Sequence, residues 1–501
     1  MVRPARADRK LAVGGEPHSP LQYRLLPATA RFAYAVDNPL SDSYDVIVVG
    51  GGLGGLTAAR RVSAAGHSVL LAEQHSQFGG LATTFKRRGY VFDVALHGFP
   101  IGMRRSFRKY WGREFADRVV QVKRIRFENP QFQLETTFDA TDFTRLLTDR
   151  FGVEERTVGA FFECLRGMNY YDRTDESTGD LFQRFFPDRN DVWRLLMEPI
   201  TYANGSTLDD PAITYGIVFG NFMSEGVYTF DGGTDTLMNM MVTSLRDAGV
   251  VCESQALVES ILIEKGRVEG AVINGQPVRA RAVVSNANLL RTVHELVGDD
   301  CFPLEFLAKV GTVRPSCSSA QVYIGIKPGE SFDSPGDLVF HATNSRYDAE
   351  DILACPPVSR TFSVYAPSLR DNGLHTIVAS MNARYDDWRR MAEQEYEYAK
   401  EALIENALAA LESLVPGIRG KVAYAEAATP TTFERYTRHT LGASFGTKFE
   451  GLECSRSLAS QVGGLFHVGS TGIIMSGWLG AANYGVIAAN EVDKYLADSG
   501  C

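Results

Sequence analysis

The chain has 501 residues, of which 45% are hydrophobic, 22% charged and 11% aromatic, so it suits two or three domains and excludes the disordered and fibrous classes. A formal charge of −9 argues against a nucleic-acid partner, whose phosphates would require a concentrated basic face. The seven cysteines are scattered without C-x-x-C spacing, which argues against a disulfide framework or a metal site and favours a reducing, cytoplasmic location.

Residues 1–42 are expected to form an N-terminal extension. The first ten residues are basic, but no continuous apolar stretch follows of the kind that a secretory signal needs. A transit peptide is the weaker alternative, because Asp8 and the early prolines disfavour it.

A dinucleotide-binding pattern follows. Residues 45–49 (DVIVV) are a β-branched run typical of a parallel strand buried on both faces. The glycine-rich stretch 50–55 fits G-x-G-x-x-G, and residues 56–65 are good helix formers. A second strand at 68–72 then ends at Glu73, 23 residues after Gly50. Strand, glycine turn, helix, strand and acid in this order predict a Rossmann-like nucleotide site.

Each part of this pattern has a physical role in such a site. Gly50 allows the tight turn, Gly52 gives a diphosphate access to the backbone, and Gly55 lets helix and strand pack closely. The free N–H groups near Leu53 would face the phosphates at the positive end of the helix dipole. Glu73 would bind the ribose hydroxyls and disfavour a 2′-phosphate.

Two further motifs carry a family resemblance. Residues 77–82 (QFGGLA) resemble the second glycine pair of FAD enzymes of the glutathione-reductase and amine-oxidase type, and residues 89–93 (GYVFD) resemble the G-Y-x-F-D turn of phytoene desaturases. The chain is thus similar to the phytoene desaturase and carotenoid isomerase group, which implies FAD as the cofactor.

Distant segments complete this resemblance. Residues 230–233 and the following helix to Ala248 look like the middle segment of the FAD domain in that group. Antiparallel strands are expected at 256–261 and 268–272, joined by a turn at Lys265 and Gly266, and 282–287 resembles the returning strand.

The C-terminal part resembles the flavin end of the same group. Residues 464–468 are expected to form a last buried strand, and a helix is expected from about Ala481. That helix would point its positive end at the flavin pyrimidine. Ser470 and the stretch 473–475 (IIM) depart from the family pattern beside the expected flavin, where they bear on the substrate and the reaction and not on FAD binding.

The expected fold class is α/β, with a Rossmann-like FAD-binding domain made of discontinuous segments plus an α+β substrate domain. The FAD-binding domain is expected at 43–100, 230–300 and 422–501, and the substrate domain at 101–229 and 301–421. The uncharged stretch 465–490 is rich in glycine and is read as a turn and helix, so no transmembrane segment is expected.

The substrate domain is rich in aromatic residues, most of which we expect in the core. Three aromatic residues and one methionine lie just before the middle FAD segment and are the preferred lining residues, namely Phe219, Phe222, Met223 and Tyr228. Residues 386–414 are expected to form one long helix that ends before Pro416. The stretch 429–436 (TPTTFERY) resembles the T-P-x-T-x-x-R-Y segment of carotenoid-isomerase-like enzymes.

The sequence therefore predicts an FAD-dependent desaturase or dehydrogenase that moves a hydride from a hydrophobic, isoprenoid or polyene substrate to flavin N5. A redox-neutral cis-trans isomerase or a saturase that uses reduced FAD is one alternative, and a non-enzymatic lipid-binding escort protein on the same fold is another. No nucleic acid partner is expected, peripheral membrane contact is left open, and the sequence does not predict the oligomeric state.

Site residues follow from these motifs. The candidates for polar groups beside the flavin are His97, Arg435 and Tyr436, for which a structural hydrogen-bonding role is the alternative to catalysis. The predicted cofactor-binding residues are Gly50, Gly52, Leu53, Gly54, Gly55, Glu73, Gln74, Gly79, Gly80, Leu81, Ala82, Val258, Gly469, Ser470, Gly477, Gly480 and Ala481.

Overall fold

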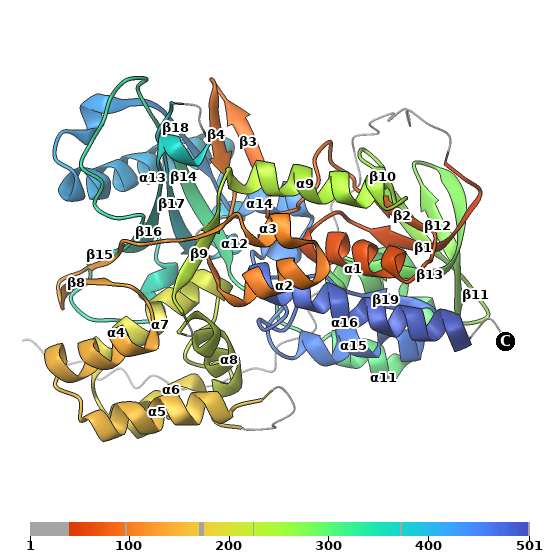
Figure 1. The fold of residues 1–501 in the computed structure, drawn as a ribbon, viewed down its shortest axis with the longest axis horizontal. Helices are drawn as coiled ribbons and strands as arrows, with labels where there is room; N and C mark the ends of the chain where they lie inside the picture. Colours follow the sequence, from red (N-terminus) through yellow and green to blue (C-terminus); the bar gives the residue numbers. More distant parts are fainter. Residues whose placement is uncertain (1–39, 96–97, 170–174, 224, 371–372, 499–501) are drawn as a thin grey trace, which may run out of the picture. The chain divides into compact units, whose positions relative to one another are not determined.

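The computed structural model describes residues 40–501 except 96–97, 170–174, 224, 371–372 and 499–501 (Figure 1). Nearly all of the expected extension 1–42 therefore lies outside the described residues, as does His97. All the helices and strands below lie in the unit formed by residues 36–501.

The first sheet gathers strands from three separate parts of the chain, in the order β10-β2-β1-β13-β12-β11, with β19 also paired to β13. Pairing is parallel between β10, β2, β1, β13 and β19, and antiparallel between β13, β12 and β11. The strand bounds are β1 Ser43–Val49, β2 Val69–Ala72, β10 Val251–Glu253, β11 Val258–Glu264, β12 Arg267–Ile273, β13 Gln276–Ser285 and β19 Leu465–His467.

Helices cover both faces of this sheet, as the β-branched sequence of β1 predicts. Val46 and Val48 pack on the side of α1, α9 and α16, whereas Ile47 and Val49 pack on the side of α11 and α15. The helix bounds are α1 Leu53–Ala64, α2 Gly102–Tyr110, α3 Arg113–Ala116, α9 Gly233–Asp247, α10 Leu289–Arg291, η2 Thr292–Val297, α11 Leu304–Val310, α15 Gly451–Gln461 and α16 Gly477–Asp498.

Two glycines let α1 and α16 approach closely although they lie far apart in the sequence. A Cβ on Gly54 would lie 2.6 Å from the carbonyl oxygen of Val468, and a Cβ on Gly485 would lie 2.4 Å from the carbonyl oxygen of Gly54. Figure 1 shows the two helices side by side beneath β1.

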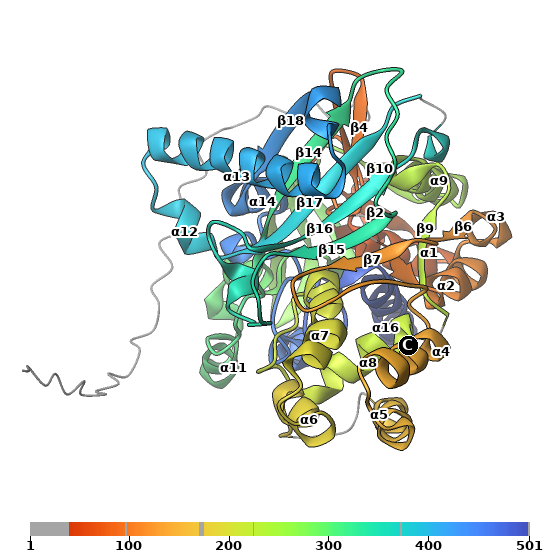
Figure 2. The ribbon, with the colours of Figure 1, turned by 90° about the vertical axis from the view of Figure 1, so that its left-hand side faces the viewer.

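The second sheet has the order β18-β14-β17-β16-β15-β7-β8, and helix α13, Glu393–Leu414, covers its outer face (Figure 2). Its strands are β7 Ile125–Glu128, β8 Gln133–Thr136, β14 Ser318–Ile326, β15 Leu338–Ala342, β16 Ser359–Tyr365, β17 Thr376–Ala383 and β18 Val422–Ala428. Alternate residues of β14, such as Ala320, Val322 and Ile324, pack under α13, so the residues between them point inward.

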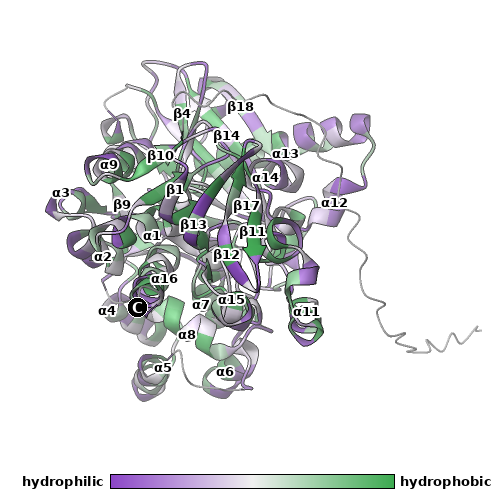
Figure 3. Cartoon of the chain, turned by 90° about the vertical axis from the view of Figure 1, so that its right-hand side faces the viewer, coloured by the Kyte–Doolittle hydropathy of each residue, from purple (hydrophilic) through white to green (hydrophobic). Residues whose placement is uncertain are grey.

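A group of helices packs against β15 and β7 through an aromatic-rich core. These helices are α4 Ala140–Arg145, η1 Leu146–Arg150, α5 Glu155–Gly167, α6 Thr178–Phe185, α7 Asn190–Asn204 and α8 Ala212–Phe222. The structure also contains two small sheets. One consists of β3 Thr84–Arg87 and β4 Tyr90–Asp93, and the other consists of β5 Phe99–Pro100, β6 Val119–Gln121 and β9 Val227–Phe230. Figure 3 shows hydrophobic strands at the centre and polar stripes along peripheral helices.

Several sequence expectations differ from the structure in detail. The expected helix at 386–414 is two helices, α12 Tyr385–Arg389 and α13 Glu393–Leu414, because Trp388 is buried at the end of α12 and α13 then packs along β14 and β18. The last helix begins at Gly477 rather than near Ala481.

The strands also cross the expected domain boundaries. Strand β18 was expected in the FAD-binding domain, yet it pairs with β14 in the second sheet. Conversely, α2 and α11 were expected in the substrate domain and pack into the two cores of the first sheet. Within the part of the chain that the structure describes, no helix is both long and apolar enough to cross a membrane.

Candidate functional site

The turn after β1 is built from backbone alone. Gly50 has a φ of +91°, which favours glycine, and its N–H donates to the carbonyl of Ala72 across 2.8 Å. Helix α1 starts immediately afterwards, with Gly52 as its N-cap and no side-chain cap. The N–H groups of its first turn therefore lack intrahelical partners, beside a cavity that Gly52, Leu53 and Gly54 line.

Gly55 lies behind this turn. A Cβ there would lie 2.2 Å from the carbonyl oxygen of Gly50, so any side chain would force helix and strand apart.

Glu73 closes one end of the same turn. Its Oε2 accepts from the N–H of Gly51 at 2.7 Å, and its Oε1 accepts from the N–H of His75 at 2.9 Å. Burial raises the pKa of Glu73, while the N–H groups of His75 and Gly51 oppose that rise. Both oxygens keep a second lone pair, so this carboxylate can accept from two neighbouring hydroxyls of a ligand. Gln74 lines the cavity beside it.

The second glycine pair lies directly against the first loop. Gly79 and Gly80 have φ values of +119° and +59°, and the N–H of Gly79 donates to the carbonyl of Gly51 at 2.7 Å. A Cβ on Gly80 would lie 3.2 Å from the Cα of Gly52. Both glycines line the cavity, and so do Leu81 and Ala82, which follow them.

Segments from the middle and the end of the chain complete the crevice. Val258 lines it at the start of β11, and Ser470, Gly477 and Ala481 line it at the turn into α16. Gly469 and Gly480 lie behind its surface, because a Cβ on either would lie 2.2 Å from a backbone oxygen, of Ala287 and Ile474 respectively.

The crevice also presents an unpaired donor. Asn288 lines it after β13, and its Nδ2 is buried with no hydrogen-bond partner among the described residues. A glycine cradle, a carboxylate that can accept from ribose hydroxyls and the free amide donor of Asn288 fit a dinucleotide cofactor.

Two catalytic candidates lie at the cavity's exposed edge. Arg435 and Tyr436 are on α14 Pro430–Thr437, both line the cavity, and Tyr436 is 52% exposed. The backbone carbonyl of Tyr436 is hydrogen-bonded by His75 Nε2, and the two rings lie 5.9 Å apart. His75 follows Glu73 by two residues, so Tyr436 lies close to the expected ribose end. The catalytic role of Arg435 and Tyr436 stays a prediction.

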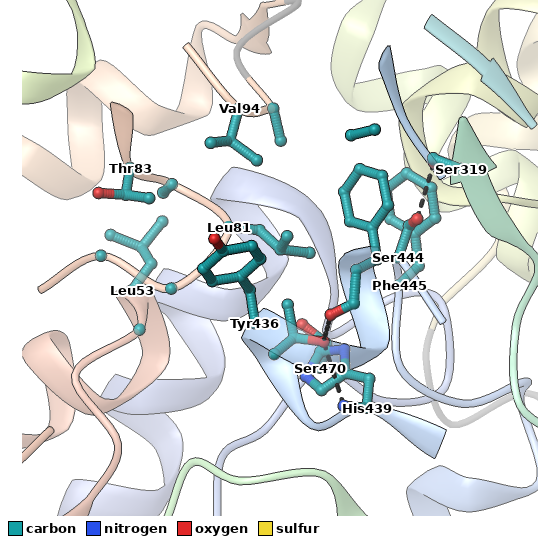
Figure 4. Close-up of a pocket in the computed structure, with 18 of the residues that line it drawn as sticks. Leu53, Leu81, Thr83, Val94, Ser319, Tyr436, His439, Ser444, Phe445 and Ser470 are labelled. Atoms are coloured by element: carbon teal, nitrogen blue, oxygen red, sulfur yellow. Dashed lines mark hydrogen bonds between the residues drawn. The ribbon is translucent and has the colours of Figure 1, made fainter. Parts of the chain in front are cut away.

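The crevice continues into a chamber between the two sheets, and together they form one cavity of about 1010 Å³. Figure 4 shows Leu53, Leu81 and Val94 facing Ser319 and Phe445. Aromatic residues from distant elements line the chamber, namely Phe138, Phe222, Phe340, Phe445 and Trp478.

Only one of the four preferred lining residues from the sequence reaches this chamber. Phe222 lines it, whereas Phe219 and Met223 are buried in the helical core and Tyr228 does not line it. Phe219, Phe222 and Met223 lie in α8 or at its end, and this helix turns only one of its faces to the cavity, whereas Tyr228 lies in β9.

A set of polar residues that was not predicted from the sequence lies on the inner face of the second sheet. Five of them line the chamber, namely Ser319, Gln321, Thr361, Ser380 and Asn382. The alternation in residues 318–324 (SSAQVYI) is the signal that could have identified them, since every second residue must share a face. Ser319 also hydrogen-bonds to Ser444 at 2.7 Å.

Comparison with known proteins agrees with this geometry. Residues 48–113 match the family model of the NAD(P)-binding Rossmann-like domain. The chain is 24% identical to prolycopene isomerase of Daucus carota, covering 90% of this chain and 80% of the relative. It is 23% identical to human all-trans-retinol 13,14-reductase, covering 82% and 78%. It is 27% identical to 4,4'-diapophytoene desaturase of Staphylococcus haemolyticus, covering 80% and 88%.

Solved structures show the same fold. An oxidoreductase from Methanosarcina mazei superimposes with a TM-score of 0.63 at 19% identity, covering 89% of this chain and 99% of that one. A putrescine oxidase gives 0.62 at 14% identity, covering 90% and 99%. Together these findings confirm the resemblance to the desaturase and isomerase group, the predicted fold class and the predicted cofactor, FAD.

Proposed function

We propose that this chain, a relative of an FAD-type oxidoreductase family, is a desaturase or dehydrogenase that acts on a largely apolar isoprenoid or polyene substrate. The observation that carries the proposal is the single cavity of about 1010 Å³, whose lining runs from the glycine loops to the inner face of the second sheet. A cofactor held at the glycine end and a substrate in the chamber would therefore meet without a partition between them.

When bound, FAD would supply the two-electron acceptor for this reaction. The chain's own groups bind and orient it. The first-turn N–H groups of α1 would face its diphosphate, and Glu73 would accept from its ribose hydroxyls. The N-terminus of α16 at Gly477 would stabilise negative charge at the other end of the cofactor.

The chamber residues would orient the substrate and exclude water. Phe222, Phe340 and Phe445 supply flat apolar surfaces against which a hydrocarbon chain can lie. This chemistry requires positioning more than acid-base catalysis, so no catalytic triad is needed. Arg435 and Tyr436, at the exposed edge near His75, are proposed to shield the nucleotide end.

A redox-neutral isomerase or a saturase is the second candidate, supported by the names of the isomerase and retinol reductase relatives. The two glycine loops that lie against each other support a cofactor-binding enzyme over a non-enzymatic escort protein. The cytoplasmic location stays a prediction.

An absorption spectrum of the purified protein, followed by anaerobic addition of isoprenoid and polyene compounds, tests the proposal. A desaturase would be yellow and would lose its flavin colour as the compound is oxidised. An isomerase or saturase would turn over only after prior reduction of the flavin. A colourless protein that cannot be reconstituted with FAD would contradict all of these enzymes.

A further inference from the structure

A polar row crosses the inner face of the second sheet. In the strand register Gln321 of β14 lies opposite Ser380 of β17, Ser380 lies opposite Thr361 of β16, and Thr361 lies opposite Phe340 of β15. All four side chains point to the same face and all four residues line the chamber. The row therefore changes from polar to aromatic between β16 and β15.

One side-chain atom of this row is buried and unpaired among the described residues. Thr361 is 1% exposed, and its Oγ1 has no hydrogen-bond partner there. Gln321 is 2% exposed, and its Oε1 accepts from the hydroxyl of Tyr323, so its Nε2 is the group of this amide that can donate to a ligand. Buried polar groups are almost always paired, so unpaired ones that line a cavity point to a ligand.

We propose that the substrate of the site described above carries a hydroxyl or carbonyl oxygen that binds Thr361 and Gln321. The inference rests on the proposed function and narrows its substrate class to an oxygenated apolar molecule. The Gln321 Nε2 donates to the oxygen, and the Thr361 hydroxyl donates to a carbonyl or accepts from a hydroxyl. The apolar remainder lies against Phe340 and beyond it.

An unsubstituted hydrocarbon would fit this part of the chamber less well. It would leave Thr361 Oγ1 unpaired and offer Gln321 Nε2 no acceptor, and burying an unpaired polar group is unfavourable. Sites built to pair with a hydroxyl discriminate strongly against analogues that lack it for the same reason.

Binding of matched isoprenoids to the FAD-loaded protein tests this inference without any turnover. Farnesol, farnesal and farnesene share one chain and differ in carrying a hydroxyl, a carbonyl or neither oxygen. Their dissociation constants are measured by equilibrium dialysis. Whichever of farnesol and farnesal binds more tightly should bind about tenfold more tightly than farnesene, because one hydrogen bond contributes about this much to the affinity. Comparison of the dissociation constants of farnesol and farnesal shows whether the site prefers a hydroxyl or a carbonyl oxygen.

Substitutions in the polar row test whether Thr361 and Gln321 cause the difference in affinity between the oxygenated compounds and farnesene. Thr361→Val keeps the shape of the side chain and should weaken binding of the oxygenated compound about fivefold to tenfold while leaving farnesene unchanged. Thr376→Val is the control, since Thr376 lies on the same face of β17 and does not line the cavity. Gln321→Leu should act in the same direction as Thr361→Val.

Two outcomes would overturn the inference. One is farnesene binding as tightly as the oxygenated compounds, and the other is Thr361→Val weakening all three equally. Either result in a yellow, FAD-loaded protein leaves the proposed function standing. Failure to bind FAD at all would instead count against the proposed function itself.

Discussion

The two ends of the cavity are built by different means. At the nucleotide end, recognition comes from backbone atoms and from glycines whose missing Cβ makes room, as at Gly55 and Gly80. At the substrate end, it comes from side chains that strands of the second sheet and distant helices bring together, such as Gln321, Thr361 and Phe340. A backbone site tolerates almost no change at its glycines, whereas a side-chain site can change one residue at a time.

The largest expected effect follows from closing the backbone site. Gly55→Ala would place a Cβ 2.2 Å from the carbonyl oxygen of Gly50, which cannot move without disturbing β1. We expect a loss of about 3 kcal/mol or more in the free energy of unfolding, together with loss of bound FAD. Urea unfolding and the absorbance of the flavin measure both.

A matched substitution shows whether glycine itself or its surroundings matter. Gly159 lies inside α5, and a Cβ there would meet no atom within 4 Å. Gly159→Ala should therefore leave FAD binding unchanged and stabilise the protein by roughly 0.5–1 kcal/mol. Equal destabilisation by the two variants would contradict the role given to the glycine turn.

The next effect concerns the buried carboxylate of Glu73 at the nucleotide end. Glu73→Gln keeps the shape but places an amide donor against the N–H of Gly51 or His75. We expect FAD to dissociate about tenfold to hundredfold more readily, because hydrogen bonds to a carboxylate are worth roughly 1.5–3 kcal/mol. Fluorescence titration of the apoprotein with FAD measures it, and Glu155→Gln on an exposed helix turn should change nothing.

Each half of the molecule also contains a buried histidine, and this pair predicts the pH dependence of stability. Burial lowers the pKa of His467, in β19 of the first sheet, to about 4, and burial together with Arg360 lowers the pKa of His341, in β15 of the second sheet, to about 4. Unfolded histidines titrate near 6.5. The unfolded chain therefore binds more protons below that value, and stability falls as the pH drops from 6.5 toward 4.

Between about pH 7.5 and about pH 5 each histidine should remove about 2 kcal/mol from the free energy of unfolding. Urea unfolding of the unaltered protein and of the variant His467→Gln at the two pH values measures the share of His467. His467→Gln keeps a donor for the carbonyl of Ala287, which His467 Nε2 contacts at 2.9 Å, and should remove only the first sheet's share. A pH dependence unchanged by this variant would show that His467 does not titrate as its burial requires.

The smallest expected effect belongs to the substrate end. Phe222→Leu removes one aromatic face from the chamber and keeps an apolar side chain at the end of α8. Binding of an apolar ligand should weaken about fivefold, or about 1 kcal/mol, while the affinity for FAD stays unchanged. A parallel loss of FAD would show that the two ends are not independent.

The same contrast explains how much could be predicted from the sequence. The strand at 45–49, the turn at 50–55 and Glu73 lie within thirty residues, and the physical demands on them are local, so their order is readable. The turn at Lys265 and Gly266 was also predicted correctly, because both residues have the positive φ that a two-residue hairpin requires.

The residues at the substrate end could not be predicted from local sequence patterns. The row of Gln321, Ser380 and Thr361 exists only because β14, β17 and β16 pair in one register, and that register is set by packing under α13. The break between α12 and α13 carries no proline or glycine and follows from the burial of Trp388. Such features depend on tertiary contacts that a periodic pattern does not contain.

The pairing of β1 with β13, and of β13 with β19, has a consequence for synthesis in the cell. A ribosome releases β1 and its glycine turn first, but β13, which pairs with β1, and α16, which packs on α1, emerge hundreds of residues later. The edge of β1 that β13 covers and the face of α1 that α16 covers therefore stay open while the rest of the chain is made. The cofactor crevice, which needs segments from both ends of the chain, forms only when translation is almost finished.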